Sequence, residues 1–286
     1  MKKVLTGLSP KALMHAQEDE YEHKAVFIAE YEGVSGADYA IRTMQSERVI
    51  EWSFANTTSE GIKLKTNKVR GPASFIQATT RPLLHPENET RLLFVQMDES
   101  PELTTGILER QAQEAENGAV QADEALFDRW HHFIRSLVPH RVLIPFASKL
   151  LGHFPMGRVR SRRDFPKLLG LIQVSAFLHQ NGRPRNADYI LADHADYAIG
   201  KVIFENSYNT GPEMCLLTLL KAARGFKGDF TAANIMNVTG WRKSKTYEFM
   251  GRGEELGYID TTPTRGFYRL IRDIREPDLH LPESLD

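Results

Sequence analysis

Residues 24–30 read KAVFIAE, with the large apolar residues Val26, Phe27 and Ile28 placed between a lysine and a glutamate. A run of this kind is typical of a buried parallel strand that helices cover on both faces. Glu30 would then stand at the carboxyl end of the strand, where open α/β sheets bind their ligands. A carboxylate there can polarise a water molecule or lie near a metal ion. The alternative is a strand that ends in a solvated acid.

The segments on either side of this strand predict helices. Residues 1–23 show no leading strand and fit one short helix, with Ser9 as its cap and Pro10 at its first position. Residues 35–48 predict a second helix, and its inner stripe is expected to hold Tyr39, Ile41, Met44 and Gln45.

A β-hairpin is predicted next. Residues 49–54 and 61–69 alternate apolar and polar side chains, and a short polar loop separates them. The second arm places its lysines on one face and its apolar residues on the other, Lys63 and Lys65 against Ile62 and Leu64. The lysine face can contact phosphates, or it can be an ordinary solvated face.

Two further strands are expected after the hairpin. Residues 73–80 form a second buried run that ends in the adjacent hydroxyls of Thr79 and Thr80, and residues 92–97 form a third. If the first two strands are neighbours in the sheet, these hydroxyls lie beside Glu30. Hydroxyls and a carboxylate together can orient a water molecule around a phosphate.

The pattern becomes helical beyond residue 101. Helices are predicted over residues 104–113, 123–137, 165–180 and 188–208, with a loop at 182–185 and four arginines within 158–163. The second of these helices carries a wide apolar stripe made of Leu126, Phe127, Trp130, Phe133, Ile134 and Leu137.

The last part of the chain has the element order of a winged helix-turn-helix. After a turn-rich stretch at 208–212, helices are predicted at 212–224, 231–237 and 242–256, and a strand, a turn and a strand follow. Cations open the third helix and stand on the wing turn: Arg242, Lys243, Lys245 and Arg265. This placement favours contact with nucleic acid, although such units also serve as protein adaptors.

Charge and composition narrow the classes of partner. Residues 211–272 carry ten Lys or Arg against six Asp or Glu, whereas residues 273–286 carry five acids and one arginine. A basic module before an acidic tail suggests a polyanion partner, and a tail that competes with it. The single cysteine, Cys215, is expected to be a packed thiol. No apolar run is long enough to cross a bilayer, so we expect a cytoplasmic protein without membrane contact.

Two stretches of the chain are similar to known proteins. They are ATTRPLLHPENETRLLFVQMDESPE, residues 78–102, and RRDFPKLLGLIQVSAFLHQ, residues 162–180. Both resemble bacterial primase-helicase-like ATPases of mobile elements. With its order of strand, carboxylate, hairpin, hydroxyl-ended strand, arginine and helical domain, the chain resembles an AAA+ ATPase of the helicase type, in the manner of minichromosome-maintenance-like proteins.

This resemblance implies roles for individual residues. The strand at 24–30 corresponds to Walker B, with Glu30 as its catalytic acid, and the hairpin lysines Lys63 and Lys65 face DNA. The remaining roles fall on hydroxyls and arginines: Thr79 or Thr80 as sensor 1, Arg91 or Arg81 as arginine finger, and Arg162 or Arg163 as sensor 2.

The chain departs from this family pattern at two points. Ala29 stands where most Walker B strands have an aspartate that orients magnesium. The sequence also lacks the GxxxxGK[ST] motif, whose backbone and lysine hold the β and γ phosphates. ATP and Mg²⁺ are therefore expected only with a P-loop supplied from elsewhere. On this reading the chain is the carboxy-terminal part of such an ATPase.

The expected architecture is α/β plus α. It consists of a partial AAA+ core at 1–112, a helical lid at 113–209, a winged helix at 210–272 and an acidic tail at 273–286. The expected function is DNA binding within a replicative helicase or primase-like ATPase of a mobile element or prophage, without ATP hydrolysis by the isolated chain. Expected partners are DNA and a homo-oligomeric ring or an upstream P-loop polypeptide. The alternative is a transcriptional regulator or a protein adaptor.

Overall fold

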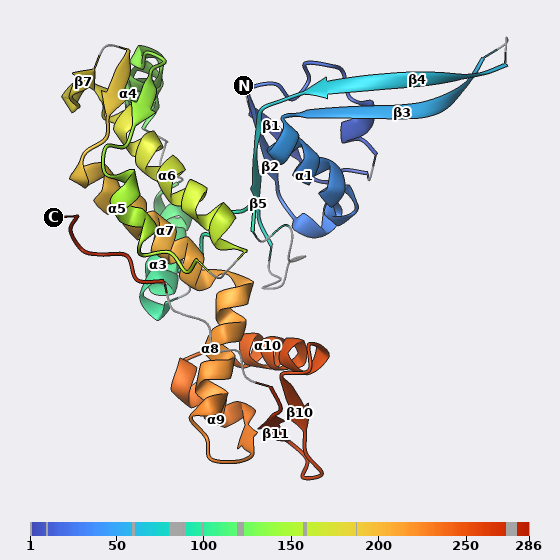
Figure 1. Cartoon of the computed structure of the whole chain (residues 1–286), viewed down its shortest axis with the longest axis vertical. Helices are drawn as coiled ribbons and strands as arrows, with labels where there is room; N and C mark the ends of the chain where they lie inside the picture. The colour runs from blue at the N-terminus through green and yellow to red at the C-terminus, as the bar shows by residue number, and fades with distance from the viewer. Residues whose placement is uncertain are drawn as a thin grey trace. The chain divides into compact units, whose positions relative to one another are not determined.

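The chain is a mixed α/β protein with small sheets (Figure 1). The computed structural model describes residues 2–9, 11–58, 61–79, 88, 90–98, 100–118, 123–156, 159–186, 188–272 and 279–285. It divides into two compact units, one of residues 1–92 with 228–269 and the other of residues 93–227 with 270–286. These limits differ from the expected boundaries near residues 112 and 209.

A parallel sheet organises residues 1–92. Its strands are β1 (Lys2–Leu5), β2 (Lys24–Ile28) and β5 (Ala73–Gln77), in the order β1-β2-β5. The prediction of the strand at 24–30 is confirmed, but the prediction that no strand precedes it is wrong. β1 was not predicted because two of its four residues are lysines, which leaves only a short apolar pattern. In the structure the Lys3 ammonium pairs with Glu20 and lies 4.5 Å from the Tyr21 ring centroid.

The sheet is covered on one face. Val26 and Ile28 of β2 are buried and pack with α1 (Asp38–Glu47) in a single apolar cluster. Phe27, between them, points the other way and is only half-buried. On that same face, Val4 and Ile76 of the flanking strands are 60% and 51% exposed. The prediction of a strand buried on both faces is therefore wrong for the described residues.

Short 3-10 helices lead into α1. They are η1 (Leu13–His15), η2 (Tyr31–Gly33) and η3 (Ser35–Ala37). The N-cap residue of η1 is Ala12, so the cap predicted at Ser9 is wrong, and Pro10 lies outside the described residues. In α1 the residues Ala40, Ile41 and Met44 are buried. Tyr39 is 63% exposed and Gln45 half-buried, so the inner position predicted for Tyr39 is wrong.

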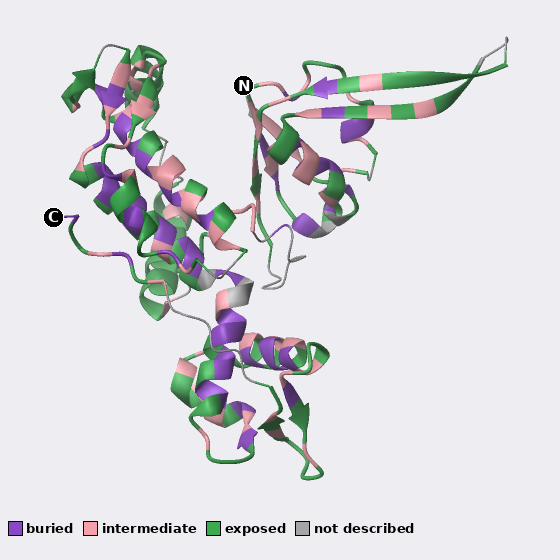
Figure 2. Ribbon diagram, in the orientation of Figure 1, coloured by how far each residue is buried: buried purple, intermediate pink, exposed green. Residues whose placement is uncertain are grey.

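The predicted hairpin is confirmed, with longer arms. β3 (Val49–Thr58) and β4 (Gly61–Arg70) pair antiparallel from Val49 opposite Arg70 to Thr58 opposite Gly61. Ile50 and Val69 are buried at the base, where the hairpin joins the sheet. The outer part extends away from the sheet and is exposed on both faces (Figures 1 and 2).

The segments predicted as the second and third buried strands differ from expectation. β5 ends at Gln77, and its residues are half-buried or exposed. Residues 92–98 form no strand, so the third strand is wrong. The Phe94 N–H donates to Ser207 Oγ at 2.7 Å, and Val95 is 84% exposed. A β-strand forms only where its backbone groups pair with those of a neighbouring strand. Here the Phe94 N–H is paired with a serine side chain of α7 instead.

The second unit is mainly helical. Its elements are α3 (Pro101–Asn117), α4 (Glu124–Ser136), β6 (Arg141–Leu143), α5 (Ala147–Leu151), α6 (Ser161–Leu178), η4 (Gln180–Gly182), β7 (Arg185–Asn186), β8 (Tyr189–Leu191), α7 (His194–Thr210) and α8 (Pro212–Arg224). The small sheet has the order β6-β8-β7. The helix predicted from residue 188 begins at His194, because residues 189–191 pair as a strand with β6. Cys215 is buried, as expected.

A buried carboxylate joins the central elements of this unit. Asp196, in the first turn of α7, is 0% exposed and accepts hydrogen bonds from Arg183 Nε (2.7 Å) and Nη2 (2.9 Å). It also accepts from Ser175 Oγ of α6 at 2.7 Å and from the Asp193 N–H at 3.0 Å. Burial by itself raises the pKa of Asp196, but these hydrogen bonds outweigh it and leave that pKa below the usual value.

The end of the chain packs against the same unit. Leu281 and Leu285 are buried, the Tyr197 hydroxyl donates to the Pro282 carbonyl at 2.6 Å, and Lys201 Nζ lies 2.5 Å from a Glu283 carboxylate oxygen. The expectation that the acidic tail competes with a polyanion stays a prediction, because Glu283 is the one acid of the tail among the described residues. Residues 273–278 and 286 lie outside the described residues.

Residues 228–272 contain two helices and three short strands. The elements are β9 (Phe230–Thr231), α9 (Ala232–Thr239), α10 (Lys243–Glu255), β10 (Ile259–Thr261) and β11 (Phe267–Leu270), and the sheet order is β10-β11-β9. The ends of α9 and α10 lie within two residues of those predicted from the sequence, 231–237 and 242–256. On β11, Tyr268 stacks on Phe230 with ring centroids 6.3 Å apart, whereas Phe267 is 39% exposed.

The buried ion pair predicts how the stability of the second unit depends on pH. Asp196→Asn removes the buried charged partner of the Arg183 guanidinium, which then keeps only the more exposed Asp193 carboxylate, 3.4 Å from its Nη1, and it should lower the free energy of unfolding by about 3 kcal/mol at neutral pH. Because the folded-state pKa of Asp196 is lowered, its contribution is complete above about pH 4 and is lost as the pH falls through the folded-state value.

Urea unfolding of both proteins at several pH values measures this difference. The gap between them should narrow in acid. Asp188→Asn, at an exposed position, is the matched control and should leave stability unchanged. An unfolding free energy unaffected by Asp196→Asn at neutral pH would contradict the role given to this ion pair.

Candidate functional site

The carboxyl ends of β2 and β5 lie side by side. The Ala78 N–H donates to the Ile28 carbonyl at 3.2 Å, and the Tyr31 N–H donates to the Ala78 carbonyl at 2.9 Å, so the pairing continues past both strands. Glu30 and Thr79, both exposed, follow these adjacent ends. The two strands are neighbours in the sheet, which is the condition under which the sequence places Thr79 beside Glu30. Thr80 and Arg81 lie outside the described residues.

Among the described residues, the edge at Glu30 and Thr79 offers few ligands for ATP and Mg²⁺. Ala29 precedes Glu30, so the end of β2 offers one carboxylate. Among the described residues, no group of three or more His, Cys, Asp or Glu side chains is placed to hold a metal ion. The sequence also lacks a glycine-rich phosphate loop. The catalytic roles given to Glu30 and Thr79 stay predictions.

A polar network beside Glu30 was not found from the sequence. The Tyr31 hydroxyl donates to Asp38 Oδ2 at 2.5 Å, and Asn88 Nδ2 donates to the same oxygen at 2.6 Å. Arg42 Nη1 donates to Asn88 Oδ1 at 2.7 Å. Burial, and then the hydrogen bond to Asp38, raise the pKa of Tyr31 to about 12. The network ties Asn88, which is 7% exposed, to the start of α1.

Arg91 lies at the other end of α1. Its Nη1 donates to Ser46 Oγ, and its Nε is buried without a hydrogen-bond partner among the described residues. Ser46 is eight residues beyond Asp38, which corresponds to about 12 Å along a helix. The contacts of Arg91 therefore place it beside Ser46 and do not join it to Glu30.

The described arginines of the run at 158–163 differ in exposure. Arg160 is half-buried, with its Nε 2.8 Å from Asp164 Oδ2 and its guanidinium 5.1 Å from the Tyr208 ring centroid. Arg162 and Arg163 are exposed in the first turn of α6. They belong to the second unit, whereas Glu30 belongs to the first.

The hairpin lysines stand on an exposed ribbon. Lys63 lies opposite Asn56 and Lys65 opposite Phe54, and both lysines are exposed. On the opposite face Ile62 and Leu64 are 75% and 77% exposed. The alternation predicted for this arm is present, but neither face is buried in the described part of the chain.

A group of cations marks the start of α10. Arg242 is the N-cap residue, its side chain makes no capping hydrogen bond, and Arg242 and Lys243 are exposed. Lys245 Nζ lies 4.9 Å from the Trp241 ring centroid. Before this helix, Thr239 Oγ1 donates to the Ile235 carbonyl and accepts from the Trp241 N–H, so Thr239 does not cap α10.

Arg265 lies in the turn between β10 and β11. Gly266 follows it with φ 82°, a conformation that glycine adopts at no steric cost, and the Phe267 N–H donates to the Thr264 carbonyl at 3.1 Å. Arg265 is exposed. The neighbouring Arg269 is instead held by Asp229, with Nε 2.7 Å from Oδ1.

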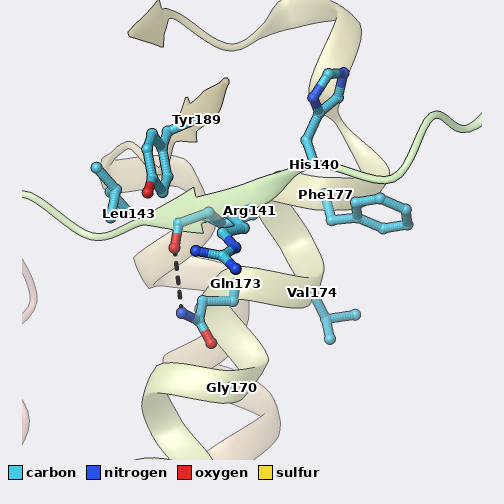
Figure 3. A pocket seen from close by; sticks show the side chains of 9 residues that line it. His140, Arg141, Leu143, Gly170, Gln173, Val174, Phe177 and Tyr189 are labelled. Carbon is cyan, nitrogen blue, oxygen red and sulfur yellow. Dashed lines mark hydrogen bonds between the residues drawn. The ribbon is translucent and has the colours of Figure 1, made fainter. Parts of the chain in front are cut away.

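The second unit also has an open depression of about 560 Å³ (Figure 3). It lies between β6 and α6, and its lining includes His140, Arg141, Gln173, Phe177 and Tyr189. Gln173 Nε2 donates to the Val142 carbonyl at 3.3 Å, which joins the helix to the strand. None of the residues predicted as functional lines this depression.

Comparison with models of known protein families and with curated protein sequences finds no match to this chain. In the parts of the chain that the structure describes, every helix is too short or too polar to cross a lipid bilayer.

The polar network predicts a stabilising role for Asn88. Asn88→Ala removes the hydrogen bonds that the Asn88 amide donates to Asp38 and Tyr31 and the one that it accepts from Arg42. It should lower the free energy of unfolding by about 1–3 kcal/mol. Thermal or urea unfolding measures the effect. Asn56→Ala, on the exposed hairpin, should change stability by less than about 0.5 kcal/mol. Equal effects of the two substitutions would contradict the importance of the network.

Proposed function

We propose that this protein binds DNA through the start of α10 and the turn between β10 and β11. The observation that carries the proposal is the placement of Arg242, Lys243 and Lys245 in the first turn of one helix. The first backbone N–H groups of the helix, which have no partner within it, lie in the same turn as these cations. Both features favour phosphate. Arg265 on the exposed turn adds a second cationic contact.

The order of elements supports this choice of surface. α8, α9 and α10 are followed by β10 and β11, which is the order of a winged helix, and α10 takes the place of the recognition helix. Between α9 and α10, Gly240 with φ 69° forms the tight turn that this motif requires. Backbone contacts of this kind fix position and carry little sequence information.

We further propose that the chain is part of a helicase or primase-like AAA+ ATPase and does not hydrolyse ATP by itself. The parallel β2 and β5, the exposed ends at Glu30 and Thr79, and the lysine-bearing hairpin between these strands support this proposal. A separate polypeptide or upstream sequence would supply the phosphate loop, because Glu30 and Thr79 by themselves cannot bind a triphosphate strongly.

ATP hydrolysis by the purified chain tests the second proposal. We expect turnover at the background level with and without single-stranded DNA, and the same level for Glu30→Gln. Glu22→Gln changes another acid of the same unit and shows whether any loss of activity is specific to Glu30. Hydrolysis that Glu30→Gln abolishes and Glu22→Gln retains would show that the chain is a complete ATPase.

Titration of the full-length chain with duplex and single-stranded DNA tests the first proposal. Replacing Arg242, Lys243 and Lys245 with alanine should weaken binding to all sequences alike. Because three phosphate contacts are lost, the slope of log affinity against log salt should flatten by about 2–3.

A matched variant replaces three exposed arginines of the second unit, Arg110, Arg141 and Arg185, with alanine and keeps the same net charge as the first. It should bind as the wild-type chain does. Equal losses in both variants, or no binding at low salt, would favour the protein-adaptor alternative. Tight binding of one duplex sequence alone would favour a transcriptional regulator.

A further inference from the structure

We propose that the groove between β6 and α6 binds an extended, acidic peptide of another protein, which adds to β6 as a further strand. The groove is the open depression of about 560 Å³ in the second unit, a volume within the range of ligand pockets. It belongs to a different unit from the start of α10, and the inference does not depend on the proposed function.

β6 is the edge strand of its sheet. In the described part of the chain, one side of β6 pairs with β8, and the other side has no partner strand. The Ala192 N–H donates to the Leu143 carbonyl at 2.9 Å on the paired side. Successive residues of a strand direct their backbone groups to opposite sides, so the N–H and C=O of Val142 point away from β8. An edge of this kind is a template on which a further strand can pair.

A side-chain amide occupies part of this edge. Gln173 of α6 reaches across the groove, and its Nε2 donates to the Val142 carbonyl at 3.3 Å (Figure 3). A primary amide offers the same kind of N–H donor as the backbone of a neighbouring strand. The bond is long, and Gln173 is exposed, so its side chain can turn into solvent and keep its hydrogen bonds with water. A peptide N–H can therefore replace it on the Val142 carbonyl.

The wall opposite β6 is one stripe of α6. Four residues line the groove at the helical spacing i, i+3, i+4 and i+7, namely Gly170, Gln173, Val174 and Phe177. Val174 is 55% exposed, and a Cβ added to Gly170 would meet no atom within 4 Å, so this wall has room beside it. Its apolar side chains can contact every second side chain of an added strand, while the backbone of that strand pairs with β6.

The charge of the groove selects an acidic peptide. Arg141 of β6 is exposed and lines the groove, and none of the described lining residues is an aspartate or a glutamate. A carboxylate of the peptide would form an ion pair with Arg141, whereas a lysine at the same place would be repelled. The partner that fits best is therefore an extended segment in which acidic and apolar residues alternate.

Fluorescence anisotropy of a labelled peptide tests the proposal on the full-length chain. The probe is a capped hexapeptide of alternating valine and glutamate, and its dissociation constant should be on the order of 100 µM, because few backbone groups pair. Changing its glutamates to lysine should weaken binding about tenfold or more. Arg141→Ala should weaken binding of the glutamate peptide about fivefold. Arg185→Ala, on the exposed β7, is the matched control and should leave binding unchanged.

Two substitutions test strand addition itself. Val142→Pro removes the N–H on the open edge and leaves the pairing with β8, because a strand tolerates proline where the N–H faces away from the sheet. It should weaken binding about tenfold or more. Gln173→Ala frees the Val142 carbonyl and should tighten binding about threefold, whereas the loss of a side chain that only contacts the peptide would weaken it. Circular dichroism should confirm that both variants are folded.

The outcomes separate strand addition from other uses of the groove. A chain that does not bind the peptide at up to about 1 mM, or a Val142→Pro variant that binds as the wild type does, would overturn the proposal. If Val142→Pro does not fold, Gln173→Ala decides, and weaker binding by that variant would overturn the proposal. Displacement of the peptide by a short thymidine oligonucleotide would also overturn it, in favour of a groove that binds nucleic acid.

Discussion

The parallel pairing of β2 with β1 on one side and β5 on the other is the constraint on which residues 1–92 depend. Parallel strands need a crossover between them, and the crossover from β2 to β5 contains both α1 and the hairpin β3–β4. This pairing also sets the two carboxyl ends side by side, so that Glu30 and Thr79 occupy one edge. The hairpin rises from the same crossover, with its base in the core and its outer part in solvent.

In the second unit the equivalent constraint is electrostatic. A carboxylate with no solvent exposure must be paired, and Asp196 satisfies this requirement with Arg183, Ser175 and the Asp193 backbone. The ion pair joins the segment before β7 to the first turn of α7, and α7 in turn holds the end of the chain through Tyr197 and Lys201. The acidic end of the chain thus stabilises this unit through specific contacts.

The candidate site was predictable to the extent that it depends on local sequence. The cations at the start of α10, and Arg265 in its turn, follow from helix and turn signals that are short-range, and both stand where the sequence predicts. The polar network of Tyr31, Asp38 and Asn88 gave no such signal, because its members are up to 57 residues apart and isolated polar residues show no period. Hydrogen bonds between distant segments are decided only when those segments pack.

The sequence by itself determined the elements with a clear local period: the strand in KAVFIAE, the hairpin, and α9 and α10 to within two residues of their ends. The tertiary structure alone decided which of these were covered. Residues 92–98 have a strand-like pattern but do not pair with another strand, and the Phe94 N–H donates to a serine side chain instead. β1 has a weak pattern, yet it is a strand because its backbone pairs with β2. In the same way α6 and α4 are both amphipathic, and only α6 is buried. Periodicity specifies which face of an element is apolar, but burial requires a partner surface, and the position of that surface is a property of the whole fold.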